Sequence, residues 1–133
     1  MERVQAAQLG GRRVLLLDSI TWVEAGDAGH IVVSGSHGGR SAGEYAVLFP
    51  LALCCLNDAG VGKDQAGIAA LAMLDERDIP GVAYSHNSAR IGEACDAWEH
   101  GVISDVNTRA AELGFAIGLE LRKAIEEAFG VRS

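Results

Sequence analysis

Three polar clusters in this chain combine residue types that bind small anions and move protons. Each cluster directly follows an apolar run: SGSHGGRS at 34–41 follows IVV, NDAGVGKD at 57–64 follows LCCL, and SHNSAR at 85–90 follows GVAY. Imidazole gains and loses a proton near neutral pH, so the histidines in these clusters are natural general acids or bases. Glycine amides and guanidinium groups bind carboxylates and phosphates. The clusters therefore predict one site for a small anionic ligand.

The candidate catalytic residues are the side chains that carry a proton or adjust its affinity. His37 and His86 each stand just after an apolar run and are the two candidates for the general acid or base. Asp58 is expected to orient one of them or to act as a base itself, with an Asx turn as the structural alternative. Ser36 is the candidate nucleophile, although GSHGG is not a GxSxG elbow. Lys63 opens an expected helix, where a cation is unfavourable, and this indicates a ligand role.

The candidate ligand-binding residues are glycines, polar side chains and one arginine of the same loops. Arg90 is expected to hold a carboxylate or phosphate through its two-pronged guanidinium, and the alternative is a salt bridge with Glu93 or Asp96. The glycines allow a positive φ and a close approach of the ligand, and the alternative for them is a tight strand-to-helix turn alone. The full set is Gly35, Gly38, Gly39, Asn57, Ser85, Ser88 and Arg90.

Known nucleotide-binding motifs are incomplete in this sequence. NDAGVGKD ends like the phosphate loop GxxxxGK[ST], but Asn57 replaces the first glycine and Asp64 replaces the magnesium-binding hydroxyl. The dinucleotide fingerprint GxGxxG also fails on its spacing. Two histidines and an aspartate in the loops would suit an open metal face, but nothing in their spacing requires one. We therefore assign no metal, and the sequence leaves any cofactor unknown.

Charge and cysteine content narrow the classes of partner. The formal net charge of −7 and the pI of about 4.9 argue against a nucleic-acid-binding face, which needs clustered Lys and Arg. Cys54, Cys55 and Cys95 form no CxxC pair and indicate a reducing compartment. No apolar run approaches the roughly 18 residues of a membrane helix. We therefore expect a cytoplasmic homo-oligomer that binds a small anion, with neither nucleic acid nor membrane as partner.

The elements that must position these loops follow from the hydrophobic pattern. Apolar strands, glycine-containing loops and helices alternate along the chain, which is typical of βαβ units. We expect a single three-layer α/β domain over 1–133, with a mostly parallel sheet of about four to five strands and helices on both faces. The connection EAGDAG at 24–29 is too short for a helical crossover, so the first strand, expected over 13–23, is expected to pair antiparallel with strand 30–36. Parallel strands would gather the three loops at one edge.

The expected segments follow from the same pattern. Further strands are expected at 51–56, 79–85 and 101–104, and helices at 41–49, 63–77, 88–98 and 121–129. Asp105 or Asn107 is expected to cap an alanine-rich turn, and Gly130 to end the last helix.

These observations favour an enzyme that acts on a small carboxylate-type metabolite by acid/base chemistry. Isomerase, lyase and amidohydrolase reactions all fit, because each depends on a positioned proton carrier. Arg90 and the glycine amides would hold the anion while His37 or His86 moves protons. Two alternatives remain open at this stage: a non-catalytic anion-binding or regulatory module, and a subunit of a larger enzyme complex.

Overall fold

The computed structural model describes residues 3–61 and 63–130, and the side chains at positions 63, 64 and 67 also lie outside this description. Its centre is one sheet in the order β1-β2-β3-β4-β5-β6. The strands are β1 (Arg3–Leu9), β2 (Arg12–Leu17), β3 (Ile31–His37), β4 (Leu53–Asn57), β5 (Gly81–Tyr84) and β6 (Ile103–Val106). Strands β2 to β5 are parallel, whereas β1 and β6 are antiparallel to their neighbours. The expected mostly parallel sheet is confirmed.

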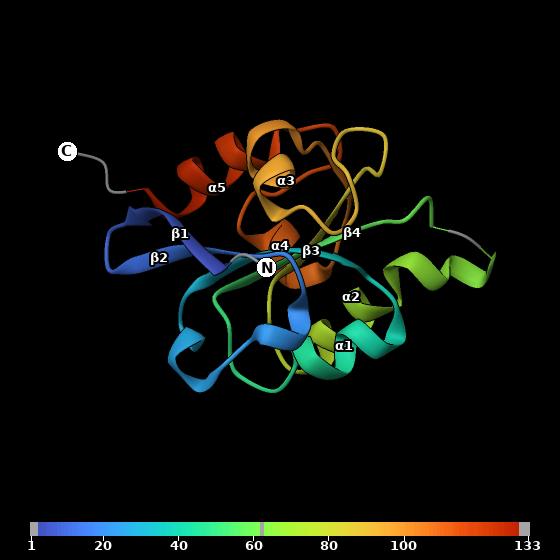
Figure 1. Cartoon of the computed structure of the whole chain (residues 1–133), viewed down its shortest axis with the longest axis horizontal. Coiled ribbons are helices and arrows are strands. Elements are labelled where there is room, and N and C mark those ends of the chain that lie inside the picture. Colours follow the sequence, from blue (N-terminus) through green and yellow to red (C-terminus); the bar gives the residue numbers. More distant parts are fainter. Residues whose placement is uncertain (1–2, 62, 131–133) are drawn as a thin grey trace.

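Helices cover both faces of the sheet, as the sequence predicts. The α-helices of the described residues are α1 (Arg40–Ala46), α2 (Ala69–Glu76), α3 (Ala94–His100), α4 (Thr108–Glu112) and α5 (Leu121–Phe129). Three short 3-10 helices, η1 (Ile20–Trp22), η2 (Ala25–Asp27) and η3 (Lys63–Ile68), lie in the connections. Figure 1 shows α1 and α2 together on one side of the sheet and α3 and α5 on the other.

The continuous apolar runs form strands that are buried on both faces. Successive strand residues point to opposite faces, so Cys54 packs in the core under α1 and α2, whereas Cys55 packs in the core under α3 and α5. Leu74 and Ile125 close these two cores from the helical side. Each fully buried side chain of this size stabilises the fold by roughly 1.5–3 kcal/mol. Two cores separated by one sheet give the three-layer architecture.

The pairing of β2 with β3 differs from the hairpin that the sequence predicts. Val14 is in parallel register with Ile31, not in an antiparallel hairpin. The connection over 18–30 is long enough to cross over because η1 and η2 fold it compactly, with Ile20 buried in the core that α1 shares. The antiparallel neighbour of β2 is instead β1, whose sequence RVQAAQL has mixed polarity and gives no strand signal.

Two expected helices are shorter than their sequence pattern indicates. The helix expected over 63–77 divides into η3 and α2. The helix expected over 88–98 begins only at Ala94, because 85–92 form a hydrogen-bonded loop. The last helix, α5, is found as expected, and Gly130 follows it. Asn107 caps α4, as one of the two caps that the sequence suggests.

The chain leaves β4 and β5 toward opposite faces of the sheet. α2 follows β4 and packs beside α1, whereas α3 follows β5 and packs with α5 (Figure 1). Open α/β sheets bind ligands outside the carboxyl ends of their strands, at the point where neighbouring connections diverge. The fold therefore places a natural crevice between the loops that follow β4 and β5.

The buried side chain of Asn107 joins α2, β5 and α4 at the amino-terminal end of β5, which is the end of the strand away from this crevice. Its Oδ1 accepts hydrogen bonds from the N–H groups of Gly81 and Ala110, each at 3.0 Å. Its Nδ2 donates to the carbonyls of Leu71 and Ile79, at 3.2 and 2.9 Å. One amide thereby satisfies four backbone groups, which belong to α2, the connection before β5, β5 itself and α4.

Asn107→Ala is expected to lower the free energy of unfolding by about 2–4 kcal/mol, because buried backbone groups that lose their partner keep their desolvation cost. Urea denaturation at pH 7 measures this loss. Asn87→Ala, on an exposed loop position, is the matched control and is expected to stay within about 0.5 kcal/mol of the unsubstituted protein. Equal losses for the two variants would contradict the structural role of Asn107.

Candidate functional site

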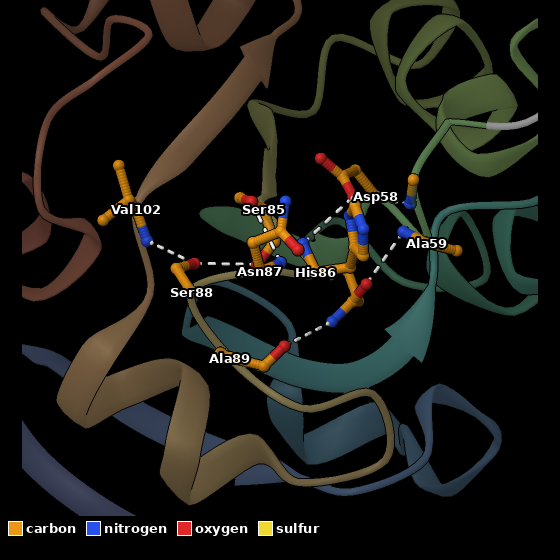
Figure 2. A network of polar contacts seen from close by, with 10 residues as sticks. Asp58, Ala59, Ser85, His86, Asn87, Ser88, Ala89 and Val102 are labelled. Carbon is orange, nitrogen blue, oxygen red and sulfur yellow. Dashed lines mark hydrogen bonds and ion pairs between the residues drawn. The ribbon is translucent and has the colours of Figure 1, made fainter.

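A buried carboxylate and a half-exposed imidazole meet where β4 and β5 end. Asp58 directly follows β4, and its N–H donates to the carbonyl of Tyr84, the last residue of β5, at 2.9 Å. His86 Nδ1 lies 3.1 Å from Asp58 Oδ1, and the His86 N–H donates to the same oxygen at 3.1 Å (Figure 2). The side chain of Asp58 is 7% exposed and that of His86 is 47% exposed. Asp58 thus holds the ring through Nδ1, and the rest of the imidazole remains accessible to a ligand.

Hydrogen bonds keep the Asp58 carboxyl ionised. Burial alone would raise the pKa of Asp58, but the Ser104 hydroxyl and the N–H groups of Gly60 and His86 outweigh it and hold the pKa below its ordinary value. The Gly60 N–H donates to Oδ1 at 2.8 Å. An ionised carboxylate beside Nδ1 favours the tautomer in which Nδ1 carries the proton. The other ring nitrogen, Nε2, is then the one that can accept a proton.

The loop after β4 is held in a strained conformation. Ala59, Gly60 and Val61 have φ angles of 51°, 75° and 65°. Glycine adopts this region readily, but a β-branched residue there is a clear outlier, and each such residue costs roughly 1–3 kcal/mol. The Asn57 side chain holds the loop, because its Oδ1 accepts from the Ala59 N–H at 2.8 Å and its Nδ2 donates to the Ala89 carbonyl at 3.1 Å. The buried Asn57 side chain therefore links the loop after β4 to the loop after β5.

The loop after β5 is shaped by its own serines. Ser88 Oγ donates to the Ser85 carbonyl at 2.7 Å and accepts from the Val102 N–H at 2.9 Å. Ser85 Oγ accepts from the Asn87 N–H at 3.1 Å. Figure 2 shows these bonds beside the Asp58–His86 contact. Both hydroxyls are engaged with backbone groups, so in this structure Ser85 and Ser88 maintain the loop that presents His86.

Gly35 gives this loop room to lie against β3. The Gly92 N–H donates to the Gly35 carbonyl at 2.6 Å. A Cβ on Gly35 would come within 2.6 Å of the carbonyl carbon of Gly92 and 2.7 Å of the Asp18 carbonyl oxygen, both of them backbone atoms. The close approach that the sequence suggests for a ligand is here made by the protein's own chain.

An open groove of about 550 Å³ lies in front of the His86 ring. It is lined by Asn57, Ala59, His86, Arg90, Ile91 and Glu93. The Arg90 side chain is 81% exposed and lies 3.9 Å from Glu93, an exposed ion pair of the kind that contributes little to stability. Ile91 is 53% exposed and forms an apolar wall. The groove thus offers a cation, a hydrocarbon surface and an imidazole.

His37 lies in a different hollow from His86. A hollow of about 150 Å³ is lined by Ile20, Thr21, Ser36, His37, Ser41, Ala42 and Tyr45. His37 Nδ1 accepts from the Gly39 N–H at 3.1 Å, at the beginning of α1. Ser36 Oγ accepts from the Ile20 N–H at 3.0 Å. The structure brings Asp58 together with His86, and it places Ser36 and His37 in the second hollow.

The remaining candidates are Gly38, Gly39 and Lys63. The Gly38 N–H donates to the Asn57 carbonyl at 2.8 Å, which ties the loop after β3 to β4. A Cβ on Gly39 would meet the His37 ring at 2.6 Å. Lys63 begins η3, but its side chain lies outside the described residues.

Other chemistry is limited in the described part of the chain. No three His, Cys, Asp or Glu side chains gather closely enough there to hold a metal ion. Burial raises the pKa of Cys54 to about 12 and that of Cys55 well above its ordinary value, so both thiols stay protonated. None of the helices described is both long and apolar enough to span a bilayer.

Two residues near the site are absent from the sequence-based candidates. Ile91 is a single apolar residue in a polar loop, and Ser104 belongs to the apolar run GVIS, so neither stands out in the sequence. Only their position beside the Asp58–His86 pair marks them.

Asp58→Asn is expected to reduce the loss of stability on acidification. The folded-state pKa of Asp58 lies below the ordinary 3.8, so its ionised form stabilises the fold above the unfolded-state pKa. That stabilisation is lost as pH falls through the folded-state pKa. In urea denaturation, the gap between the parent protein and the variant should therefore narrow from pH 7 to pH 3. Glu44→Gln, at an exposed position of α1, is the control for removal of a carboxylate. A gap that stays constant would contradict the stabilisation of ionised Asp58.

The crevice between the loops after β4 and β5 combines an oriented imidazole with an exposed guanidinium and an apolar wall. The same crevice is the position at which open α/β sheets bind ligands. No protein-family model, curated protein or solved structure matches this chain.

Proposed function

We propose that the groove is the active site of an enzyme that acts on a small carboxylate-type metabolite by acid/base chemistry, with His86 as the proton carrier. The observation that supports this most is the 3.1 Å contact between His86 Nδ1 and the buried Asp58 carboxylate. A carboxylate in this position fixes the ring orientation and stabilises the imidazolium that forms when the other nitrogen takes a proton. The expected cytoplasmic location and homo-oligomeric state stay predictions.

The proton cycle follows from this geometry. Nε2 of neutral His86 takes a proton from a substrate C–H group, and the electron pair of that bond stays on the substrate. In a hydrolytic reaction Nε2 instead takes a proton from water, and the electron pair left on the water oxygen forms the new bond to the substrate carbon. The imidazolium is stabilised by Asp58, which keeps its own charge because its pKa is held low. The proton then returns to another substrate atom or to a leaving group. A positioned general acid or base of this kind contributes typically 10²–10⁴-fold to the rate.

Arg90 is the proposed anchor for the substrate carboxylate. Its guanidinium is exposed at the groove, and its contact with Glu93 is long. A bidentate pair with a ligand carboxylate is stronger than this exposed ion pair. The net charge of −7 repels anions at long range, so the substrate must be held by a local cation. Ile91 and Ala59 would contact its hydrocarbon part.

The first test is a thermal-shift panel of small carboxylates, phosphates and amides. A ligand at a hundredfold excess over its Kd stabilises the folded state by about 2.7 kcal/mol, which such a scan detects. We expect a carboxylate to raise the Tm of the parent protein and not that of Arg90→Ala. A carboxylate that raises both melting temperatures equally would contradict the role of Arg90.

The second test separates catalysis from binding. His86→Ala is expected to keep the carboxylate-induced rise in Tm and to lose turnover by about 10²-fold or more. His37→Ala is the matched control, because this histidine lines the other hollow, and it should keep both properties. Full turnover by His86→Ala would refute the proposed proton carrier. Binding that is never accompanied by turnover in the parent protein would favour the non-catalytic module.

A further inference from the structure

A β-bulge in the edge strand β6 lies next to the candidate active site. Along the antiparallel pair of β5 and β6, Ala83 pairs with Asp105 and Tyr84 pairs with Ile103. Ser104 is therefore an extra residue that has no partner on β5. Bulges of this kind redirect one side chain, and they are frequent beside active sites. The bulge thus singles out Ser104 as a residue with a special orientation.

The Ser104 hydroxyl is buried beside the Asp58 carboxylate. Its Oγ forms no hydrogen bond with any other described residue. Tyr84 of β5 pairs with Asn57 on one side and with Ile103 on the other, so Ser104 and Asp58 stand on either side of the end of β5. The Ser104 hydroxyl also helps to lower the pKa of the Asp58 carboxyl. A buried hydroxyl without a partner is unfavourable, so such groups are retained where they serve a purpose. The charged acceptor whose pKa this hydroxyl lowers is the Asp58 carboxylate, the group that orients His86.

The carboxylate of Asp58 has one oxygen left for this hydroxyl. Its Oδ1 accepts from the N–H groups of Gly60 and His86 and contacts the His86 ring. Within residues 3–61 and 63–130, no hydrogen bond to Oδ2 is formed. All the donors therefore hold one edge of the carboxylate, and rotation about its Cβ–Cγ bond is restrained from that side alone.

We propose that Ser104 is a positioning residue for the Asp58–His86 pair: its hydroxyl donates to the Asp58 carboxylate and fixes the orientation in which Asp58 holds the His86 ring. Only the catalytic consequence of this contact rests on the proposed function. The contact itself is a property of the folded chain, and it can be measured without a substrate. The bulge in β6 then serves to aim one hydroxyl at the site.

The test is a pH titration of the Asp58 side-chain carbon by NMR in the whole protein. Ser104→Ala removes the donor, so Asp58 should titrate at higher pH than in the parent protein. Ser104→Thr keeps a hydroxyl at the same position and should restore the original titration. Among the described residues, His86 is the titratable side chain that contacts Asp58, so its ring is followed in the same spectra. Ser34→Ala is the matched control.

Ser34 is a suitable control because it is also a buried serine in the sheet, but its Oγ accepts from the Ser36 N–H and does not contact Asp58. An Asp58 titration that is identical in the parent protein and in Ser104→Ala would overturn the proposal, as would an equal shift in Ser34→Ala. If Ser104→Ala shifts the titration while His86→Ala keeps full turnover, the contact stands and the proposed function fails. Once a substrate is found, Ser104→Ala should lower kcat with little change in KM.

Discussion

The whole candidate site depends on the opposite directions in which the chain leaves β4 and β5. Right-handed crossovers place α1 and α2 on one face because the strands follow one another in order across the sheet. After β5 the chain crosses the carboxyl-terminal edge of the sheet through the loop at 85–93, and it thereby reaches the face that α3 covers. Two loops then diverge from adjacent strand ends. Side chains from both of them meet there, although they are far apart in the sequence.

The chemistry of the crevice is set by a balance between burial and hydrogen bonding at Asp58. Burial favours the neutral carboxyl, which would leave His86 without a charged partner. The Ser104 hydroxyl and the N–H groups of Gly60 and His86 tip this balance toward the ionised form, and the left-handed turn at 59–61 brings the Gly60 N–H to the carboxylate. Keeping a charged group in this nearly water-free position therefore requires the strained backbone of that turn. This arrangement needs a rigid support, which the sheet and the Asn57 side chain provide.

The parts of the fold that the sequence predicts are those with strong local signals. IVV and LCCL are continuous apolar runs, and the stripe of α5 repeats with helical periodicity, so their structures follow from composition and spacing. β1 escapes prediction because RVQAAQL becomes a strand only through its pairing with β2. The expected hairpin of β2 and β3 fails for a related reason. A chain segment without an α-helix can still cross over when 3-10 turns fold it compactly.

The sequence predicts one site formed by all three loops, but it does not indicate which of their side chains meet. Ser36-His37 and Ser85-His86 look alike in the sequence, since each pair stands just after an apolar run. They differ in their partners: His37 accepts from a nearby N–H, whereas His86 meets a carboxylate 28 positions away. Periodicity carries no information about such contacts. Ser104 illustrates the same limit, because a bulge becomes visible only when both strands are paired.

We propose that the groove between the ends of β4 and β5 binds a small carboxylate. The most direct measurement is an amide NMR titration of the whole protein with butyrate, which offers a carboxylate for Arg90 and a hydrocarbon chain for Ile91. We expect saturable shifts of the amide signals of Ala59, His86 and Ile91, with the signals around His37 unchanged. Shifts confined to the His37 hollow, or no saturable shift at all, would contradict it.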